Sequence, residues 1–285
     1  MIHALSEGRS ALGNEDRFGY AAGAAWVLDG ATDISRAQLE GRTAAWWLVE
    51  AYQAELQDRC PFGVSERART FLASLSSGVR DRLEARFPAA PAPVRKALEQ
   101  ASAALSLVRK TTDGWSVLCL ADCPVLYRDP ANGRVQAIVD PGFVRFEQRS
   151  LDALQDARAR APDADYDQLL EMIRPVLEQN RQVMNLEEGY AVGGIRPPHQ
   201  ALVSERDLPA GVTAFAIMSD GFSRWYDLFR LGTAEDLFVR IEKSDLGAVL
   251  TELRQAERRD PLGKLFPRFK QHDDATCLYV QAADL

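Results

Sequence analysis

Strand-like apolar runs stand at both ends of this chain, and long stretches of helical periodicity lie between them. The first run, AAGAAWVLDG, ends at Asp29 and Gly30, and an apolar run of this length before a sharp turn is typical of a buried strand. The final segment, DDATCLYVQ, has the same character. The helical stretches do not alternate regularly with single strands, as a doubly wound parallel sheet would require. The pattern therefore predicts an α+β layered domain.

Apolar residues at helical spacing predict the helical part of the chain. Ser65 is the expected N-cap of one helix, with Glu66 in its first turn. Trp46 and Trp47 are expected to pack in the core between another helix and a sheet. The stretches with helical periodicity are residues 36–59, 65–87, 94–108, 151–185 and 234–259.

Short strands are expected in the middle and towards the end of the sequence. The runs WSVLCLADC, PVLYRD and GRVQAIVD are separated by turn residues, including the hairpin signal Asn132-Gly133, so they are typical of an antiparallel meander. QALVSER and GVTAFAIMSDG indicate a further pair of strands. The segment GYAVGGIRPPHQ, residues 189–200, is rich in glycine and proline and is expected to be a loop beside a surface site.

The composition is that of a folded protein, and we assign residues 1–285 to a single domain. With 46% hydrophobic residues the chain can bury a sizeable core, and its net charge of −7 argues against non-specific attraction to nucleic acid or to an anionic membrane. No run approaches the roughly 18 apolar residues that cross a bilayer. The segment MIHALSEGRS lacks the features of a signal peptide, so we expect a cytoplasmic protein.

Acidic residues recur beside the strand-like runs, and this recurrence points to a metal site. A carboxylate at the edge of a buried sheet is costly unless a cation or a donor neutralises it. Any one Asp-Gly pair is more often a turn than a ligand, but several such charges gathered together require a metal. Oxygen-only ligands select the hard cations Mg²⁺ or Mn²⁺, and the bare backbone of Gly30 would let its carbonyl approach such an ion. The acids are Glu15 and Asp16, Asp29, Asp220, and Asp273 with Asp274.

In their order along the chain these motifs resemble the landmarks of the PPM family, the metal-dependent type 2C serine/threonine phosphatases. Each motif alone is weak, but together they span nearly the whole chain in the family's order. The motifs are Asn14-Glu15-Asp16, Asp29-Gly30, Ala121-Asp122-Cys123, Ser219-Asp220-Gly221 and Asp273-Asp274-Ala275-Thr276. The resemblance implies a four-layer αββα sandwich, in which helices flank two antiparallel β-sheets, with a binuclear metal site in a cleft at one end.

The resemblance also implies which residues hold the metal ions. Asp29 would bridge two ions, and the backbone carbonyl of Gly30 would bind one of them. Asp220 and Asp273 would bind the other ion. Asp122 matches an aspartate that helps to bind a third, weaker ion.

Glu15 and Asp16 would, by the same resemblance, hold metal-bound water. Two ions about 3.5–4 Å apart would lower the pKa of a bridging water, orient the phosphoryl group and neutralise charge on its oxygens. Water would then attack in line, without a phosphoenzyme intermediate. The implied protein is a stand-alone, bacterial-type, monomeric signalling enzyme that removes phosphate from phosphoserine or phosphothreonine of a phosphoprotein substrate.

The chain departs from the family pattern in three places. Ala31 follows the Asp-Gly motif, where many members have a histidine that is a candidate acid for the leaving alkoxide. Ala11 stands at the position of the phosphate-binding arginine, so Arg9 or Arg17 would have to reach the phosphate instead. The family's Gly-Asp-Ser element has become Ala-Asp-Cys around Asp122, which keeps the acid but changes its neighbours.

Two alternatives to an active phosphatase remain open. The departures at positions 11 and 31 favour a pseudophosphatase, which would bind a phosphoprotein or a regulator without turnover, whereas the retained acids Asp29, Asp220 and Asp273 oppose it. A different two-metal hydrolase, such as a nuclease, would also use paired cations, but the acidic balance of the chain disfavours it. We therefore predict an active phosphatase that binds neither nucleic acid nor membrane.

Overall fold

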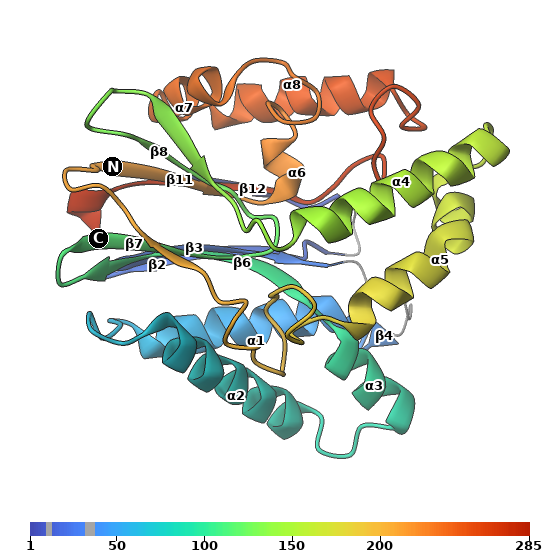
Figure 1. Ribbon diagram of the computed structural model, residues 1–285, viewed down its shortest axis with the longest axis horizontal. Helices are drawn as coiled ribbons and strands as arrows, with labels where there is room; N and C mark the ends of the chain where they lie inside the picture. The colour runs from blue at the N-terminus through green and yellow to red at the C-terminus, as the bar shows by residue number, and fades with distance from the viewer. Residues whose placement is uncertain (10–12, 32–37) are drawn as a thin grey trace.

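Two antiparallel β-sheets lie face to face in the computed structural model, which describes residues 1–9, 13–31 and 38–285 (Figure 1). Each of these two sheets has five strands. In spatial order the first sheet contains β1 (Ile2–Glu7), β12 (Ala275–Gln281), β11 (Ala214–Met218), β8 (Val125–Arg128) and β9 (Val135–Ile138). The second sheet contains β10 (Glu205–Asp207), β7 (Gly114–Leu120), β6 (Ala103–Thr111), β3 (Ala24–Gly30) and β2 (Asp16–Ala21).

Helices cover the outer faces of both sheets, so the layers run helix, sheet, sheet, helix (Figure 1). The layer on the second sheet consists of α1 (Ala44–Arg59), α2 (Ala68–Arg86) and α3 (Ala92–Gln100). The layer on the first sheet consists of α6 (Asp220–Ser223), α7 (Ala234–Glu242) and α8 (Leu246–Arg259). A further pair, α4 (Val144–Arg160) and α5 (Tyr166–Gln182), packs together at one end of the sandwich. The predicted α+β, four-layer αββα fold is confirmed.

The inner strand β3 has no polar face. Trp26 and Leu28 pack in the core beneath the helices, whereas Ala25 and Val27 pack against the other sheet. All four side chains are fully buried, because β3 lies between β2 and β6 and both of its faces are covered. A strand covered on both faces reads as a continuous apolar run, and in β3 that run stops at Asp29.

The first long helix begins later than the sequence predicts. β4 (Gln38–Leu39) and β5 (Arg42–Thr43) form a short hairpin, and its turn contains two residues with positive φ angles. Such left-handed backbone cannot be part of a right-handed helix. The side chain of Thr43 then caps α1, accepting a hydrogen bond of 3.0 Å from the backbone N–H of Trp46. The helix predicted to start at Arg36 therefore starts at the N-terminus of α1, and Arg36 itself lies outside the described residues.

The third predicted helix, residues 94–108, is wrong over its second half. α3 ends at Gln100, and the chain enters β6 at Ala103. Residues 103–109 are all buried because β6 lies between β3 and β7 with both faces covered. The alternation of polar and apolar residues is lost in such a strand, so periodicity cannot distinguish it from a buried helix.

Smaller differences concern the ends of other elements. α2 begins at Ala68 rather than at Ser65. The helical stretch 151–185 is a pair of helices, of which α4 starts earlier, at Val144, and α5 starts at a capping box formed by Asp165. β1 and β2 occupy the turn-rich start of the chain, where the sequence indicates no strand, and QALVSER is a strand only at its end, in β10.

No helix in the described part of the chain is long and apolar enough to span a membrane.

Candidate active site

The acidic residues singled out by the sequence lie where strands begin or end. Asp16 is the first residue of β2, and it pairs in antiparallel register with Asp29, close to the end of β3. Asp122 follows β7, Asp220 follows β11 and opens α6, and Asp273 precedes β12. These strands belong to both sheets, so the site is assembled from both layers of the sandwich.

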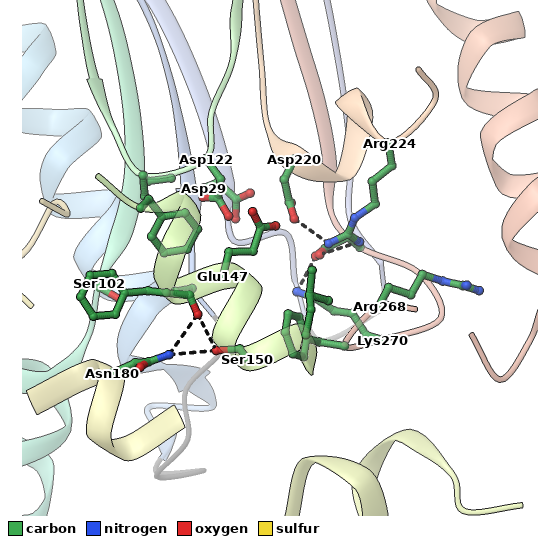
Figure 2. Close-up of a pocket in the computed structure, with 18 of the residues that line it drawn as sticks. Asp29, Ser102, Asp122, Glu147, Ser150, Asn180, Asp220, Arg224, Arg268 and Lys270 are labelled. Carbon is green, nitrogen blue, oxygen red and sulfur yellow. Dashed lines mark hydrogen bonds and ion pairs between the residues drawn. The ribbon is translucent and has the colours of Figure 1, made fainter. Parts of the chain in front are cut away.

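A cavity of about 880 Å³ lies between these strand ends and the helices α4 and α5. The five residues predicted to bind metal all line it: Asp29, Gly30, Asp122, Asp220 and Asp273. Figure 2 shows Asp29 and Asp122 side by side, with Glu147 of α4 directed towards them. The structure therefore brings together residues that are as much as 244 positions apart in the sequence, from Asp29 to Asp273.

The walls of the cavity come mainly from α4 and α5. Apolar side chains of these helices line it, among them Phe146, Leu151, Leu170 and Leu177. The loop 189–200 contributes Tyr190 and Val192. Asn180 of α5 donates hydrogen bonds to the Phe146 carbonyl and to the Ser150 hydroxyl, at 3.1 and 2.9 Å, and so fixes the two helices to each other (Figure 2). The cavity thus combines an acidic end with an apolar wall.

Asp16 and Asp29 are cross-strand neighbours that repel each other. Burial raises the pKa of Asp16 to about 8, and the charge of Asp274 adds to the shift. Burial also raises the pKa of Asp29 well above its usual value, and the charge of Asp16 is the next cause. Ser219 donates a hydrogen bond of 2.8 Å to Oδ2 of Asp16, but Oδ1 is buried without a hydrogen-bond partner among the described residues. Because such an oxygen is costly to bury without a partner, a cation bound beside this pair would stabilise it.

Asp122 and Glu147 extend the acidic group towards α4. Burial raises the pKa of Asp122 well above its usual value, and the charges of Asp220 and Glu147 raise it further. Glu147 lies in the first turn of α4, and burial and Asp220 raise its pKa as well. Ala121, directly before Asp122, has a φ of 61°, and its N–H donates a hydrogen bond of 3.2 Å to Asp140. Like charges in a desolvated space favour protonation until a cation neutralises them.

Asp220 and Asp273 differ from the other acids because cationic side chains already bind them. Arg224 Nη2 lies 2.5 Å from Oδ2 of Asp220, and its Nη1 lies 3.1 Å from Oδ2 of Asp273. Lys270 Nζ lies 2.5 Å from Oδ1 of Asp273. Burial opposes ionisation of Asp273, but Lys270 and Arg224 outweigh it and hold the pKa of Asp273 below its usual value. This half of the site is neutralised from within the chain (Figure 2).

Glu15 and Asp274 connect the two ends of the chain beside the acidic group. Asp274 accepts hydrogen bonds from the backbone N–H groups of Glu15 and Arg9, at 2.7 and 2.6 Å. The carbonyl of Glu15 accepts a hydrogen bond of 3.1 Å from the N–H of Gly30. The Glu15 carboxylate accepts a hydrogen bond from the Thr43 hydroxyl and lies 3.4 Å from Nη2 of Arg9. Its carboxylate therefore faces Thr43 and Arg9, next to the main cavity.

The positions that depart from the family pattern are placed as follows. Arg9 lines the cavity. The Nε of Arg17 lies 2.5 Å from the carboxylate of Glu50, and Arg17 is not among the described residues that line the cavity. Ala31 lines the cavity, directly after the Asp-Gly motif, and Ala11 lies outside the described residues. Of the two arginines considered for phosphate binding, Arg9 is the one that lines the cavity.

Sequence reasoning missed several charged residues that line the cavity, among them Arg224, Lys270 and Glu147. A signal for Arg224 exists, since it lies four residues after Asp220 at the start of a helical turn, and residues at this spacing share one face. Lys270 stands three residues before Asp273, a weaker signal in a loop. Glu147 carries no local signal because only the packing of α4 brings it to the acids.

Several solved phosphatase structures share the fold of this chain. The catalytic domain of the serine/threonine phosphatase PstP in complex with two manganese ions has a TM-score of 0.54 and 13% identity, over 98% of this chain and 96% of that one. The Mycobacterium tuberculosis phosphatase PstP/Ppp has a TM-score of 0.55 and 13% identity, over 98% and 97%. A bacterial serine phosphatase has a TM-score of 0.53 and 12% identity, over 99% and 97%. At this identity the likeness establishes the fold.

The family follows from the sequence itself. The profile of the protein phosphatase 2C family matches residues 8–253, a stretch that contains the first four of the five motifs. The chain therefore belongs to the protein phosphatase 2C family, as the motifs had indicated. No curated protein sequence matches the chain.

Proposed function

We propose that this chain is a metal-dependent protein serine/threonine phosphatase, which hydrolyses phosphoserine or phosphothreonine in phosphoprotein substrates. Membership of the protein phosphatase 2C family supports the proposal. The observation that carries it is that all five predicted ligands line one cavity. Because these residues come from both sheets and from distant parts of the sequence, we also propose that residues 1–285 act as one catalytic domain.

The donor set fits the hard cations Mg²⁺ or Mn²⁺. Carboxylate and carbonyl oxygens are the ligands that these ions prefer, and the unpartnered Oδ1 of Asp16, beside Asp29, is a buried acceptor that needs a positive partner. Within residues 1–9, 13–31 and 38–285, no three His, Cys, Asp or Glu side chains have the arrangement of a formed metal site, so the ligands would close around an ion as it binds. The residues proposed to hold two ions, and a third weaker one, are Asp29, Gly30, Asp220, Asp273 and Asp122.

The proposed reaction divides its tasks between the cation and the chain. Mg²⁺ or Mn²⁺, when bound, would polarise the phosphoryl group and favour ionisation of a water molecule. Glu15 and Asp16 are not among the described residues that line the cavity, and they would act from beside it, orienting the attacking water through their carboxylates. Arg9 lines the cavity and would donate hydrogen bonds to the phosphate oxygens. Because Ala31 has no proton to give, the leaving oxygen would take its proton from solvent.

The apolar wall supports a peptide as the substrate. Phe146, Leu151 and Leu170 line the cavity beside the acidic end, and they would pack against the side chains that flank a phosphorylated residue. The net charge of −7 would repel a nucleic acid. The phosphate would therefore enter the acidic end as part of a peptide, where the cations offset the repulsion.

Release of phosphate from a phosphothreonine peptide tests this proposal. The chain would be assayed with Mn²⁺, with Mg²⁺ and with a chelator, next to the variants Asp29→Ala and Asp220→Ala. Asp163→Asn is the matched control, because the side chain of Asp163 is 93% exposed and Asp163 is not among the described residues that line the cavity. We expect metal-dependent turnover in the native chain and in the control, and a loss of about 100-fold or more in both site variants.

The opposite result has a clear meaning. If the native chain binds Mn²⁺ in calorimetry but releases no phosphate from peptides or aryl phosphates, the phosphatase proposal fails and a phosphoprotein-binding pseudophosphatase takes its place. Cleavage of a phosphodiester in preference to the phosphopeptide would instead identify a nuclease.

A further inference from the structure

The charges of the cleft are divided unequally between its two halves. Asp220 and Asp273 carry two negative charges, which Arg224 and Lys270 balance at distances of 2.5 to 3.1 Å. The other acids have no such partner: among the described residues, neither Asp29 nor Asp122 forms an ion pair, and Asp16 keeps an oxygen without any hydrogen bond. The acidic charge that requires a cation therefore lies on the side of Asp29.

Arg224 is built into the fold rather than resting on the surface. It follows the short helix α6, its backbone N–H donates a hydrogen bond of 3.0 Å to the carbonyl of Asp220, and the residue is 8% exposed. Its guanidinium reaches one carboxylate from α6 and one from the segment before β12. A planar guanidinium with donors on both sides is suited to bridging two carboxylates.

The Arg224 guanidinium contacts the two carboxylates that, by the family resemblance, would bind a metal ion. The resemblance gives Asp220 and Asp273 to one divalent ion, and in this chain Arg224 forms an ion pair with each of them. Lys270 adds a second positive charge on Asp273. A divalent ion that approaches this pair meets two cations and two carboxylates that are already hydrogen-bonded.

We infer that the Arg224 guanidinium takes the place of the second divalent ion, so that the chain binds one ion tightly beside Asp29 and a second only by displacing Arg224. This inference rests on the proposed metal-dependent function, and it adds that Arg224 competes with the second ion for Asp220 and Asp273. Arg224 is a positioning residue in this scheme, because it acts through the two carboxylates that it holds.

The size of the competition follows from the bonds that the second ion must break. The charge-assisted hydrogen bond from Arg224 to Asp220 and the ion pair between Arg224 and Asp273 both stabilise the ion-free arrangement. At ordinary strengths for such bonds, the second site is expected to be about tenfold to 100-fold weaker than it would be without the arginine.

Binding of Mn²⁺ alone, in the absence of any substrate, tests this inference on the full chain. Calorimetry gives the number and affinity of the sites, and electron paramagnetic resonance of free Mn²⁺ gives an independent count. The variants are Arg224→Gln, which removes the charge but keeps a polar side chain, and Arg224→Lys, which keeps the charge without the planar guanidinium group. Circular dichroism and thermal melting establish that each variant folds.

Arg128→Gln is the matched control for these variants. Arg128 also bridges two carboxylates, at 2.5 Å from Glu235 and 3.3 Å from Glu242, but it lies on β8 and is not among the described residues that line the cavity. Its loss is therefore expected to leave Mn²⁺ binding as in the native chain.

We expect one tight site and a second, weaker site in the native chain, with the second site tightened about tenfold to 100-fold in Arg224→Gln and less in Arg224→Lys. Two native sites of equal affinity that Arg224→Gln leaves unchanged would overturn the inference and leave the proposed phosphatase intact. Absence of any Mn²⁺ binding in both the native chain and Arg224→Gln would overturn the inference together with the proposed cofactor, and phosphate release under chelator would then decide the function.

Discussion

Asp16→Asn should stabilise the metal-free protein at neutral and alkaline pH. Asp16 is 1% exposed, and burial raises the pKa of its carboxyl from 3.8 to about 8. The folded state therefore keeps a proton that the unfolded state releases above about pH 4. Folding stability is then highest at low pH and falls as the pH rises towards 8. Asparagine carries no charge in either state, so the variant lacks this slope.

The size of the effect follows from the same two values. Between about pH 5 and pH 8 the Asp16 carboxyl is ionised in the unfolded state but mostly protonated in the folded state. Over this range of nearly three pH units, each unit lowers the free energy of unfolding by about 1.4 kcal/mol. The native chain should therefore lose at most about 4 kcal/mol more than Asp16→Asn over this interval. The figure is an upper bound because water that enters the cleft reduces the cost of burying the charge.

Urea unfolding in chelator at about pH 5 and pH 8, followed by fluorescence, measures this difference. Asp163→Asn serves as the control, because its side chain is 93% exposed and its loss should leave the pH dependence unchanged. A native chain and an Asp16→Asn variant with parallel pH profiles would refute the reasoning. So would a variant that is less stable than the native chain at pH 8.

Two further predictions concern backbone close to the site. In Gly221→Ala the new Cβ would lie 1.8 Å from the carbonyl oxygen of Asp274, so we expect a loss of about 1–3 kcal/mol in urea unfolding and weaker Mn²⁺ binding in calorimetry. In Tyr52→Phe the hydroxyl that exchanges hydrogen bonds of 2.8 and 2.9 Å with the backbone of Gly194 is lost, which should cost about 1–3 kcal/mol in the same unfolding assay.

Gly247→Ala is the matched control for the glycine variant. It lies in α8, and an added Cβ would meet no atom within 4 Å, so alanine should be neutral or stabilising by up to about 1 kcal/mol. Equal unfolding midpoints for Gly221→Ala and Gly247→Ala would contradict the steric argument. An unchanged midpoint for Tyr52→Phe would show that the Gly194 backbone finds another partner.

Two acids of the site were predictable because each has a local signature. Asp29 and Asp220 each end a run of apolar residues and precede a glycine, so the sequence indicates both the strand and the turn that exposes the carboxylate. The layered fold followed from the same runs. The order of the strands within each sheet was not predictable from the runs alone, because pairing depends on contacts between distant segments.

The missed features depend on tertiary contacts. β6 was taken for the end of a helix because cover on both faces removes the alternation that marks a strand. Glu147 reaches the acids only because α4 packs beside the strand ends. Arg224 could have been found from its spacing to Asp220, but its second partner, Asp273, is 49 residues away in the sequence and becomes visible only in the folded chain.

The order of strands in the first sheet has a consequence for how the chain folds. β12 lies between β1 and β11, so within the described part of the chain β1 has no strand to pair with until residues 275–281 are made. Pairing across such a long stretch of sequence is slow, and the unpaired edges of β1 and β11 are exposed in the meantime. Asp273 lies two residues before this same strand. A nascent chain would thus acquire Asp273 and the strand that completes the first sheet almost together, so the proposed ligand set is complete only when β12 is ready to pair.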